Sequence, residues 1–241
     1  MGRHGTIAGR KAAQDSKRSA IFTKYTRAII VAAKAGSDME YNSALKHAVD
    51  KAKAINMPND NINKAIKKGA GEIDGANFES SSFEGYGAAG VAVIVETLSD
   101  NKNRTTSSVK HAFDKYGGNL GTPGCVSYMF NRKGLIIIEK TDSIDEDQLM
   151  EVALEAGMED LITYDDSFEI LTAPEDFEMV LEAIKAAGYE TLEADVEYVP
   201  SMEQTPTEEH DIKNLKKMIS VLEDDDDVQK VHHNCTLDLS E

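Results

Sequence analysis

Apolar positions recur at helical spacing three times within the first 70 residues. Beginning at Ser16, the first series has intervals of four, four and three, the period of an amphipathic helix. Its apolar positions are Ile21, Tyr25, Ile29 and Ala32. Gly36 provides an end to this helix, and two further series follow at 45–55 and 62–66, the second of them after Pro58. The pattern predicts a bundle of three short helices that ends near residue 70.

Short runs rich in β-branched residues replace the helical pattern after residue 82. Residues 90–96 and 126–130 predict two strands, and residues 101–116 between them predict a helix. The connection at 69–82, which is rich in Gly, Ser and Asn, reads as a hinge between the helices and these strands.

From Gly134 the chain has the pattern of a self-contained unit. The elements run strand, helix, strand, strand, helix, strand, which is the order of a ferredoxin-like sandwich. Their predicted ranges are 135–139, 145–156, 161–164, 168–172, 174–187 and 190–199. One helix (208–222) and one strand (228–237) then remain, too little to bury a core alone. We therefore expect them to return to the unit that precedes residue 134.

These patterns predict an α+β fold of three domains. An N-terminal three-helix bundle is followed by two ferredoxin-like α/β sandwich domains, and the third domain is inserted in the second. The predicted limits are 1–78 for the helical basic domain, 79–133 plus 206–241 for the discontinuous domain, and 134–205 for the acidic ferredoxin-like domain.

Charge is divided unevenly along the chain. Residues 1–71 hold 14 Lys/Arg against 5 Asp/Glu, a net charge of +9, whereas residues 72–241 hold 12 against 38, a net charge of −26. A Lys/Arg stripe on a single helix is typical of a solvated face. The asymmetry between the two ends instead favours a polyanion-binding module joined to an acidic body.

Basic residues of the first domain are therefore the candidate nucleic-acid contacts. At about 100° per residue, one stripe lies opposite the apolar face of the first helix, a glycine-rich arm precedes it, and two lysines end the third helix. The predicted phosphate contacts are Arg3, Arg10, Lys11, Lys17, Lys24, Arg27, Lys34, Lys67 and Lys68. Such contacts position a protein on nucleic acid without reading its sequence.

Two loops flank the helix predicted at 101–116. Asn101 and Arg104 at its start offer hydrogen-bond donors, and Gly117, Gly118 and Asn119 after its end offer backbone N–H groups without bulky side chains. Both loops have two interpretations, tight turns or a close approach to RNA or to a peptidyl end.

No catalytic constellation emerges from the sequence. The glycines at 85, 87 and 90 spell GxGxxG, but they precede a strand, so a tight turn is favoured over a dinucleotide site. His233 and Cys235 share a strand face without further zinc ligands, and the acidic run 224–227 is typical of a solvated turn. We expect no enzymatic activity, cofactor, metal site or small-molecule substrate.

Compartment and membrane association follow from composition. Cys125 and Cys235 lie far apart without a CxxC pair, which favours a reducing compartment. No apolar run approaches the roughly 20 residues that span a bilayer, and no secretory signal begins the chain. We expect a cytoplasmic protein with no membrane partner.

Seven sequence blocks carry a family resemblance. They are residues 10–15, 21–24, 56–62, 83–87, 100–105, 117–121 and 128–134. In these blocks and in their order the chain resembles the YebC/PmpR family over nearly its whole length. It departs from the family at 2–7, where GRHGTI replaces the common Ser-Lys-Trp run, and it contains no tryptophan. An aromatic contact by the arm is therefore not expected.

The resemblance implies a three-domain cytosolic protein with a role in gene expression. The family is generally described as DNA-binding transcriptional regulators. Related members, including the mitochondrial translational activator of cytochrome c oxidase, look like ribosome-associated translation factors. We expect a non-enzymatic nucleic-acid-binding regulator, with a ribosome-associated factor that binds rRNA near the peptidyl transferase region as the alternative. No helix-turn-helix pattern favours sequence-specific DNA reading, so the two roles stay level.

Overall fold

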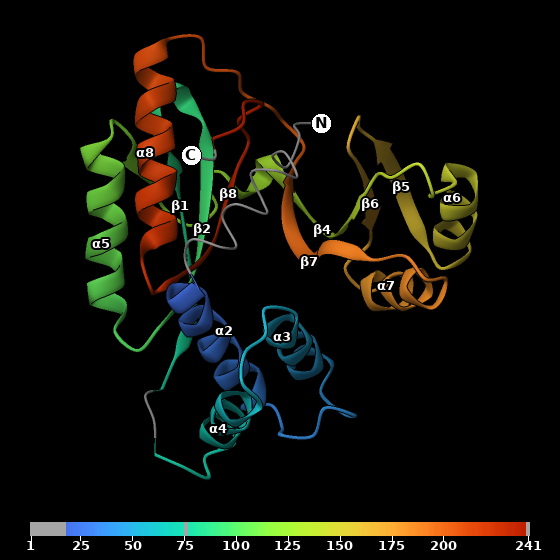
Figure 1. Cartoon of the computed structure of the whole chain (residues 1–241). Helices are drawn as coiled ribbons and strands as arrows, with labels where there is room; N and C mark the ends of the chain where they lie inside the picture. Colours follow the sequence, from blue (N-terminus) through green and yellow to red (C-terminus); the bar gives the residue numbers. More distant parts are fainter. Residues whose placement is uncertain (1–17, 75–76, 240–241) are drawn as a thin grey trace.

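The computed structural model describes residues 18–74 and 77–239 and consists of three units that meet near the middle of the molecule (Figure 1). We call them the helical unit (18–74), the split unit (77–129 with 201–239) and the inserted unit (130–200). We propose that these units are the folding domains of the chain, a division that limited proteolysis would test. The predicted contacts Arg3, Arg10, Lys11 and Lys17 lie outside the described residues.

Three helices form the helical unit, as the apolar periodicity predicts: α2 (Arg18–Ala33), α3 (Ser43–Ala54) and α4 (Asn59–Gly69). Their apolar faces close around one core that includes Ile29, Leu45 and Ile62. Asn42 caps α3 by accepting a hydrogen bond from Leu45 N at 3.0 Å. Gly69 allows α4 to pack closely on α2, because a Cβ at this position would lie 2.3 Å from Ile30 O.

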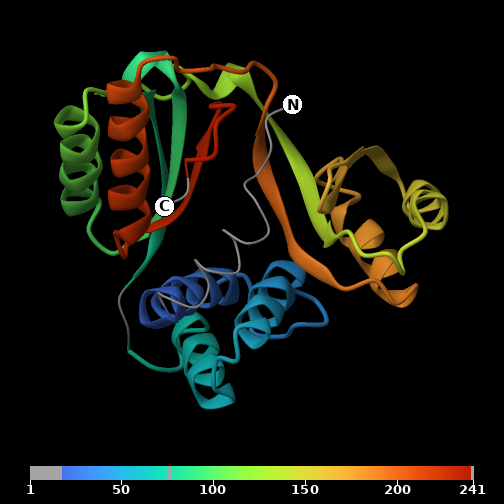
Figure 2. The ribbon, with the colours of Figure 1, turned by 45° about the horizontal axis from the view of Figure 1, so that its top comes forward.

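The split unit contains an antiparallel sheet in the order β3-β1-β2-β8, covered on one face by two helices (Figure 2). Its strands are β1 (Glu79–Tyr86), β2 (Ala92–Ser99), β3 (Asn119–Leu120) and β8 (Val228–His233), and its helices are α5 (Lys102–Lys115) and α8 (Glu209–Asp224). Val95, Phe113 and Leu215 lie together in its core. The last helix and strand return to this sheet, as expected from their inability to bury a core alone.

Strand β1 corrects the expectation of a hinge up to residue 82. Residues 79–82 are Glu and Ser, without an apolar period, yet they pair with β2 in a continuous register from Glu79↔Ser99 to Tyr86↔Ala92. The neighbouring apolar strand β2 supplies the pairing and the burial that the local sequence of β1 does not predict.

The inserted unit has the predicted ferredoxin-like order βαββαβ, with sheet order β5-β6-β4-β7. Its elements are β4 (Phe130–Glu139), α6 (Glu146–Glu155), β5 (Met158–Thr163), β6 (Ser167–Thr172), α7 (Phe177–Ala186) and β7 (Thr191–Pro200). The strand expected at 126–130 is a 3₁₀ turn, η2 (Ser127–Met129), because pairing of β4 with β7 begins at Phe130↔Pro200. Residues 130–133 therefore belong to this sheet.

The fold is α+β, as predicted, with two four-stranded antiparallel sheets, each covered by two helices. In the split unit the chain order is ββαβαβ, and the inserted unit interrupts it between β3 and α8. Within residues 18–74 and 77–239, no helix is long and apolar enough to cross a membrane.

Candidate nucleic-acid interface

Arg27 of α2 is held by groups of the split unit. Its Nη1 donates to Asp227 Oδ1 at 2.7 Å, to Leu98 O at 3.3 Å and to Asp226 O. The guanidinium also lies 5.1 Å from the ring centroid of Phe78, and the Arg27 side chain is only 13% exposed. The residue predicted to contact phosphate therefore occupies a cluster of oxygen acceptors supplied by its own chain.

Asp227 is the centre of that cluster. Besides Arg27, its carboxylate accepts from Arg104 at 2.9 Å, from Thr105 Oγ1 at 2.8 Å and from Ser99 Oγ at 3.1 Å. Burial by itself would raise the pKa of Asp227, but the hydrogen bonds from Thr105, Arg104 and Ser99 and the charge of Arg27 outweigh it and lower the pKa. Asp227 therefore stays ionised and ties α2 to the split unit.

Two other cations of the predicted stripe also contact the chain. Lys24 Nζ donates to Glu223 O at 2.7 Å, at the end of α8. Lys34 Nζ donates to Asn77 Oδ1 at 2.6 Å and to Phe78 O at 2.5 Å, so it lies on the connection between units. Lys24 and Arg27 thus both contact the acidic turn 223–227 of the split unit.

A second charged contact joins α3 to the inserted unit through Asp195 of β7. The Asp195 carboxylate contacts Lys51 Nζ, lies 3.3 Å from His47 Nε2, and contacts Lys230 of β8, which also contacts Glu197. One carboxylate therefore joins all three units. Burial alone would raise the pKa of Asp195, but the hydrogen bond from His47 and the charges of Lys230 and Lys51 hold it far below its usual range.

The same cluster shifts the pKa values of its two lysines in opposite directions. Burial lowers the pKa of Lys51 in spite of the charge of Asp195. Burial would also lower the pKa of Lys230, but Glu197 and Asp195 outweigh it and raise the pKa. Sequence reasoning missed this site. The signal was present in β7, where alternation places Glu193, Asp195 and Glu197 on one sheet face that needs cationic partners.

Helix α4 presents the other basic surface of the helical unit. Lys64, Lys67 and Lys68 are exposed, opposite the buried Ile62 and Ala65, and their side chains make no hydrogen bond or ion pair with another described residue. Lys68 and Arg27 both line a hollow of about 390 Å³. The other residues that line it belong to α2 and the connection: Phe22, Thr23, Thr26, Ile30 and Phe78. We call Lys64, Lys67 and Lys68 the open face, and Lys24, Arg27 and Lys51 the docked face.

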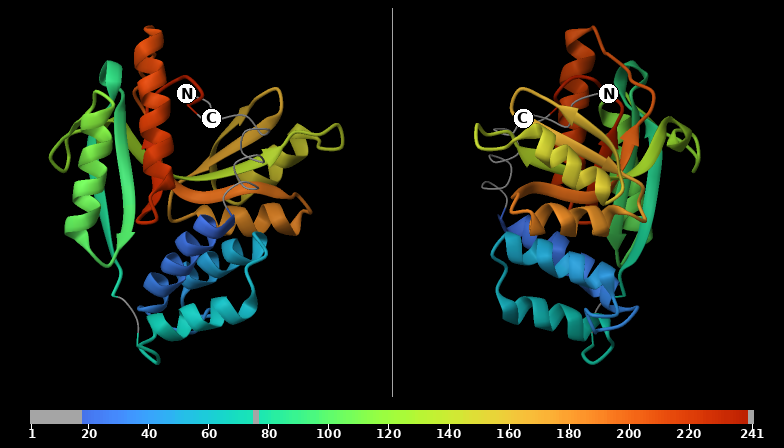
Figure 3. Two further views of the ribbon diagram at one scale, coloured as in Figure 1. Left: turned by 60° about the vertical axis from the view of Figure 1, so that its left-hand side comes forward. Right: turned by 90° about the vertical axis from the view of Figure 1, so that its right-hand side faces the viewer.

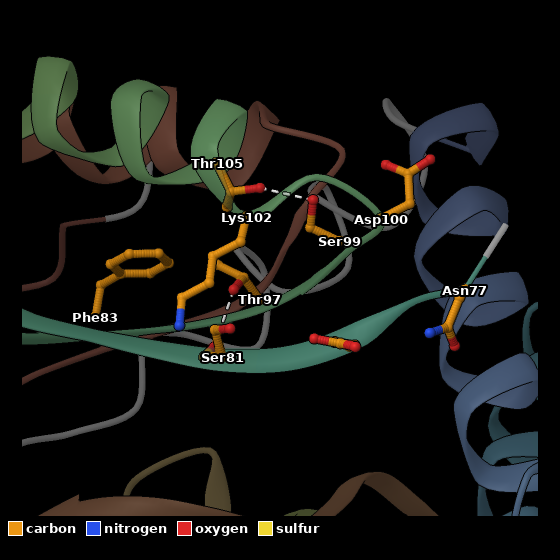
Figure 4. Close-up of a pocket in the computed structure, with 9 residues that line it drawn as sticks. Asn77, Ser81, Phe83, Thr97, Ser99, Asp100, Lys102 and Thr105 are labelled. Carbon is orange, nitrogen blue, oxygen red and sulfur yellow. Dashed lines mark hydrogen bonds between the residues drawn. The ribbon is translucent and has the colours of Figure 1, made fainter.

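The loop before α5 belongs to the docked region. Asn101 caps α5 by accepting from Arg104 N at 3.1 Å, and Arg104 also donates to Asp100 Oδ1 at 3.0 Å. A polar hollow of about 350 Å³ lies beside it. Figure 4 shows the residues that line this hollow, with Thr105 donating to Ser99 at its edge. The structure therefore brings the predicted residues Arg27, Arg104 and Asn101 into one neighbourhood.

The glycine turn after α5 lies elsewhere. The 14 residues of α5 place it about 20 Å from Asn101. Gly117 has a φ of +77°, a backbone conformation that favours glycine. A Cβ on Gly118 would lie 2.7 Å from Tyr86 O, so close packing on β1 accounts for this second glycine. Asn119 is exposed. Contact of this turn with RNA stays a prediction.

Glu84 fixes the loop that follows the glycine turn. Its buried carboxylate accepts backbone N–H groups from Gly124 at 2.8 Å, Val126 at 3.0 Å and Ser127 at 2.9 Å. Burial would raise the pKa of Glu84, but these hydrogen bonds outweigh it and lower the pKa. The next residue, Tyr128, is 64% exposed. Across the described ranges, no group of three His, Cys, Asp or Glu could hold a metal ion.

Comparisons with known proteins place this architecture in a family. Residues 3–72 match the model of the TACO1/YebC protein N-terminal domain, and residues 78–235 match that of the TACO1/YebC second and third domain. The chain belongs to the TACO1/YebC family.

Relatives cover almost the full length of the chain. It is 57% identical to a Probable transcriptional regulatory protein of Clostridioides difficile, over 97% of this chain and 98% of that protein. It is 53% identical to one of Acetivibrio thermocellus, over 95% of each. The crystal structure of a conserved hypothetical protein from Aquifex aeolicus is also similar, with a TM-score of 0.84, 42% identity and coverage of 93% and 92%. Several relatives are thus named as transcriptional regulators.

Proposed function

We propose that the protein is a non-enzymatic, nucleic-acid-binding regulator of gene expression that acts in the cytoplasm and binds phosphates first through its open face. The observation that carries the proposal is the exposure of Lys64, Lys67 and Lys68 without partners among the described residues. Desolvating three clustered ammonium groups without an anion is costly, so this surface is matched to a polyanion rather than to another protein core.

Charge on the remaining units supports an oriented complex. The segment 134–205 carries 2 Lys/Arg against 21 Asp/Glu, a net charge of −19, and would be repelled by a phosphate backbone. Only the helical unit, with the basic arm that precedes it, carries a positive net charge. We therefore propose that nucleic acid approaches the helical unit from the side of α4, with the acidic units pointing away.

The names of the relatives favour transcription, and thus DNA, as the setting. A role on ribosomal RNA is the alternative, and one observation favours it. Tyr128, 64% exposed, stands beside a loop fixed by Glu84, and an exposed aromatic ring suits stacking on an unpaired base. Phosphate contacts are common to both settings, so the open face serves either.

The first experiment measures affinity for a short duplex DNA and for a hairpin RNA as a function of salt. Lys64→Ala, Lys67→Ala and Lys68→Ala are combined in one variant. Each lost phosphate contact lowers the salt slope by about one unit, so we expect the slope for duplex DNA to fall by about three.

A matched variant removes three exposed lysines of the acidic units, Lys185, Lys213 and Lys217. Its net charge equals that of the open-face variant, but we expect its slope to stay within one unit of the wild type. Equal slopes for both variants and the wild type would refute the proposal. A larger fall in the salt slope for RNA than for DNA would favour the ribosomal role over the role in transcription.

A further inference from the structure

Helical-unit cations meet acids of both other units. Among the described residues, three Lys/Arg–carboxylate ion pairs and two contacts of His47 with carboxylates cross these boundaries, and in each the basic residue comes from the helical unit. They are Arg27–Asp227, Lys46–Glu182, His47–Glu178, His47–Asp195 and Lys51–Asp195. Figure 3 shows the helical unit lying against the other two in both views. The basic unit is therefore docked on the acidic body through a largely ionic contact.

Oxygen acceptors in this contact resemble those of a nucleic-acid backbone. Arg27 is surrounded by one carboxylate oxygen and two carbonyl oxygens, and Lys24 by a carbonyl oxygen of the acidic turn 223–227. Lys51 meets an ionised carboxylate. Arg forms the same charge-assisted hydrogen bonds with carboxylate and with phosphate. The acids of the chain thus occupy positions that phosphate oxygens could take.

We propose that the docked face is a second nucleic-acid-binding surface, masked in this arrangement by Asp227 and Asp195. Nucleic acid held on the open face competes with these carboxylates, and the helical unit then turns away from the acidic body and presents Lys24, Arg27 and Lys51. The inference rests on the proposed function, since the open face must capture the nucleic acid first.

The helical unit can move without opening a hydrophobic core. Its cluster of apolar side chains consists of residues of 22–66 and of Phe78 on the connection to β1. The main core clusters of the split and inserted units contain no residue of the helical unit. One chain connection, 70–78, joins it to β1. The movement therefore exchanges ion pairs with carboxylates for ion pairs with phosphates, and the apolar burial inside each unit is kept.

A reversible chemical cross-link at the position of an exposed ion pair, which we call the staple, tests the proposal. Lys46 Nζ and Glu182 Oε1 lie 3.0 Å apart with side chains 51% and 66% exposed, and neither residue belongs to the docked or the open face. Lys46→Cys with Glu182→Cys, in a Cys125→Ser, Cys235→Ala background, is joined by a bis-maleimide cross-linker that adds to both thiols and contains a cleavable disulfide. The same variant, capped with a monofunctional thiol reagent, is the control.

We expect the stapled protein to bind short duplex DNA through the open face alone. Its salt slope should be lower than that of the capped control by about three units, one for each cation of the docked face. Reduction of the staple should restore both slope and affinity. Dyes attached to the same two cysteines, left unstapled, should move apart when the DNA is added.

Equal slopes for stapled and capped protein, with no change in dye distance, would overturn the masked surface while leaving the proposed function intact. Failure of the capped control to bind any nucleic acid would reject both. The two failures are distinguishable because the open-face variant changes the slope only in the first case.

Discussion

The docked and the open face of the helical unit have the same local sequence character and opposite surroundings. Both consist of lysines or arginine on the polar side of an amphipathic helix. Arg27 and Lys51 meet carboxylates of the other units, whereas Lys67 and Lys68 meet no described partner. A basic stripe thus predicts that an anion will be bound. Whether that anion is nucleic acid or a carboxylate of the same chain depends on how the units pack.

Asp227→Ala should give the largest effect on the docked face. It removes the acceptor shared by Arg27, Arg104, Ser99 and Thr105, and leaves the guanidinium of Arg27 buried. Breaking a buried pair in this way costs about 3 kcal/mol. We expect a loss of that size in the free energy of unfolding, measured by chemical denaturation.

Asp226→Ala is the control, because Asp226 is exposed and only its backbone carbonyl contacts Arg27. It should change stability by no more than about 0.5 kcal/mol. Equal stabilities of the two variants would show that Asp227 does not hold the units together.

Two lysines of α3 allow a narrower comparison. Lys51 is largely buried against Asp195, whereas Lys53 is exposed on the same helix. Lys51→Met should weaken docking by about 1–3 kcal/mol, since Asp195 loses one of its charged donors. Lys53→Met should leave it unchanged. The distance between dyes at positions 46 and 182 measures docking in each variant. An equal change of this distance in the two variants would contradict the distinction between docked and exposed cations.

The smallest effect is expected from mild acid. The hydrogen bonds and charges around Asp227 hold its pKa below the usual value of 3.8, so its contribution to docking is complete above that value and is lost only as pH falls through the lower folded pKa. Arg27 and Arg104 donate to its carboxylate, and the Asp225 carboxylate accepts from the Asp227 backbone N–H. Docking should therefore persist from neutral pH to about pH 4 and fade below. Separation of the dyes already at pH 6 would show that another group controls the contact.

Much of the fold was predictable from local pattern. The periods of apolar residues gave α2, α3 and α4, and the order of elements after residue 134 gave the ferredoxin-like unit. Strand β1 was missed because its Ser-rich start has no apolar alternation and depends on β2 for pairing. The extent of β4 was also missed, since the pairing of Phe130 with Pro200 cannot be read from either segment alone.

By itself, the sequence determined the helices, the α+β class and the division of charge between a basic start and an acidic body, because periodicity and charge are local properties. Only the tertiary structure decided which cations are available. Arg27 and Asp227 are 200 residues apart in the sequence. Lys51 and Asp195 are also far apart in the sequence and lie in different units, and no local pattern encodes either contact. Electrostatic partners are chosen by distance in space, and packing of the three units sets that distance.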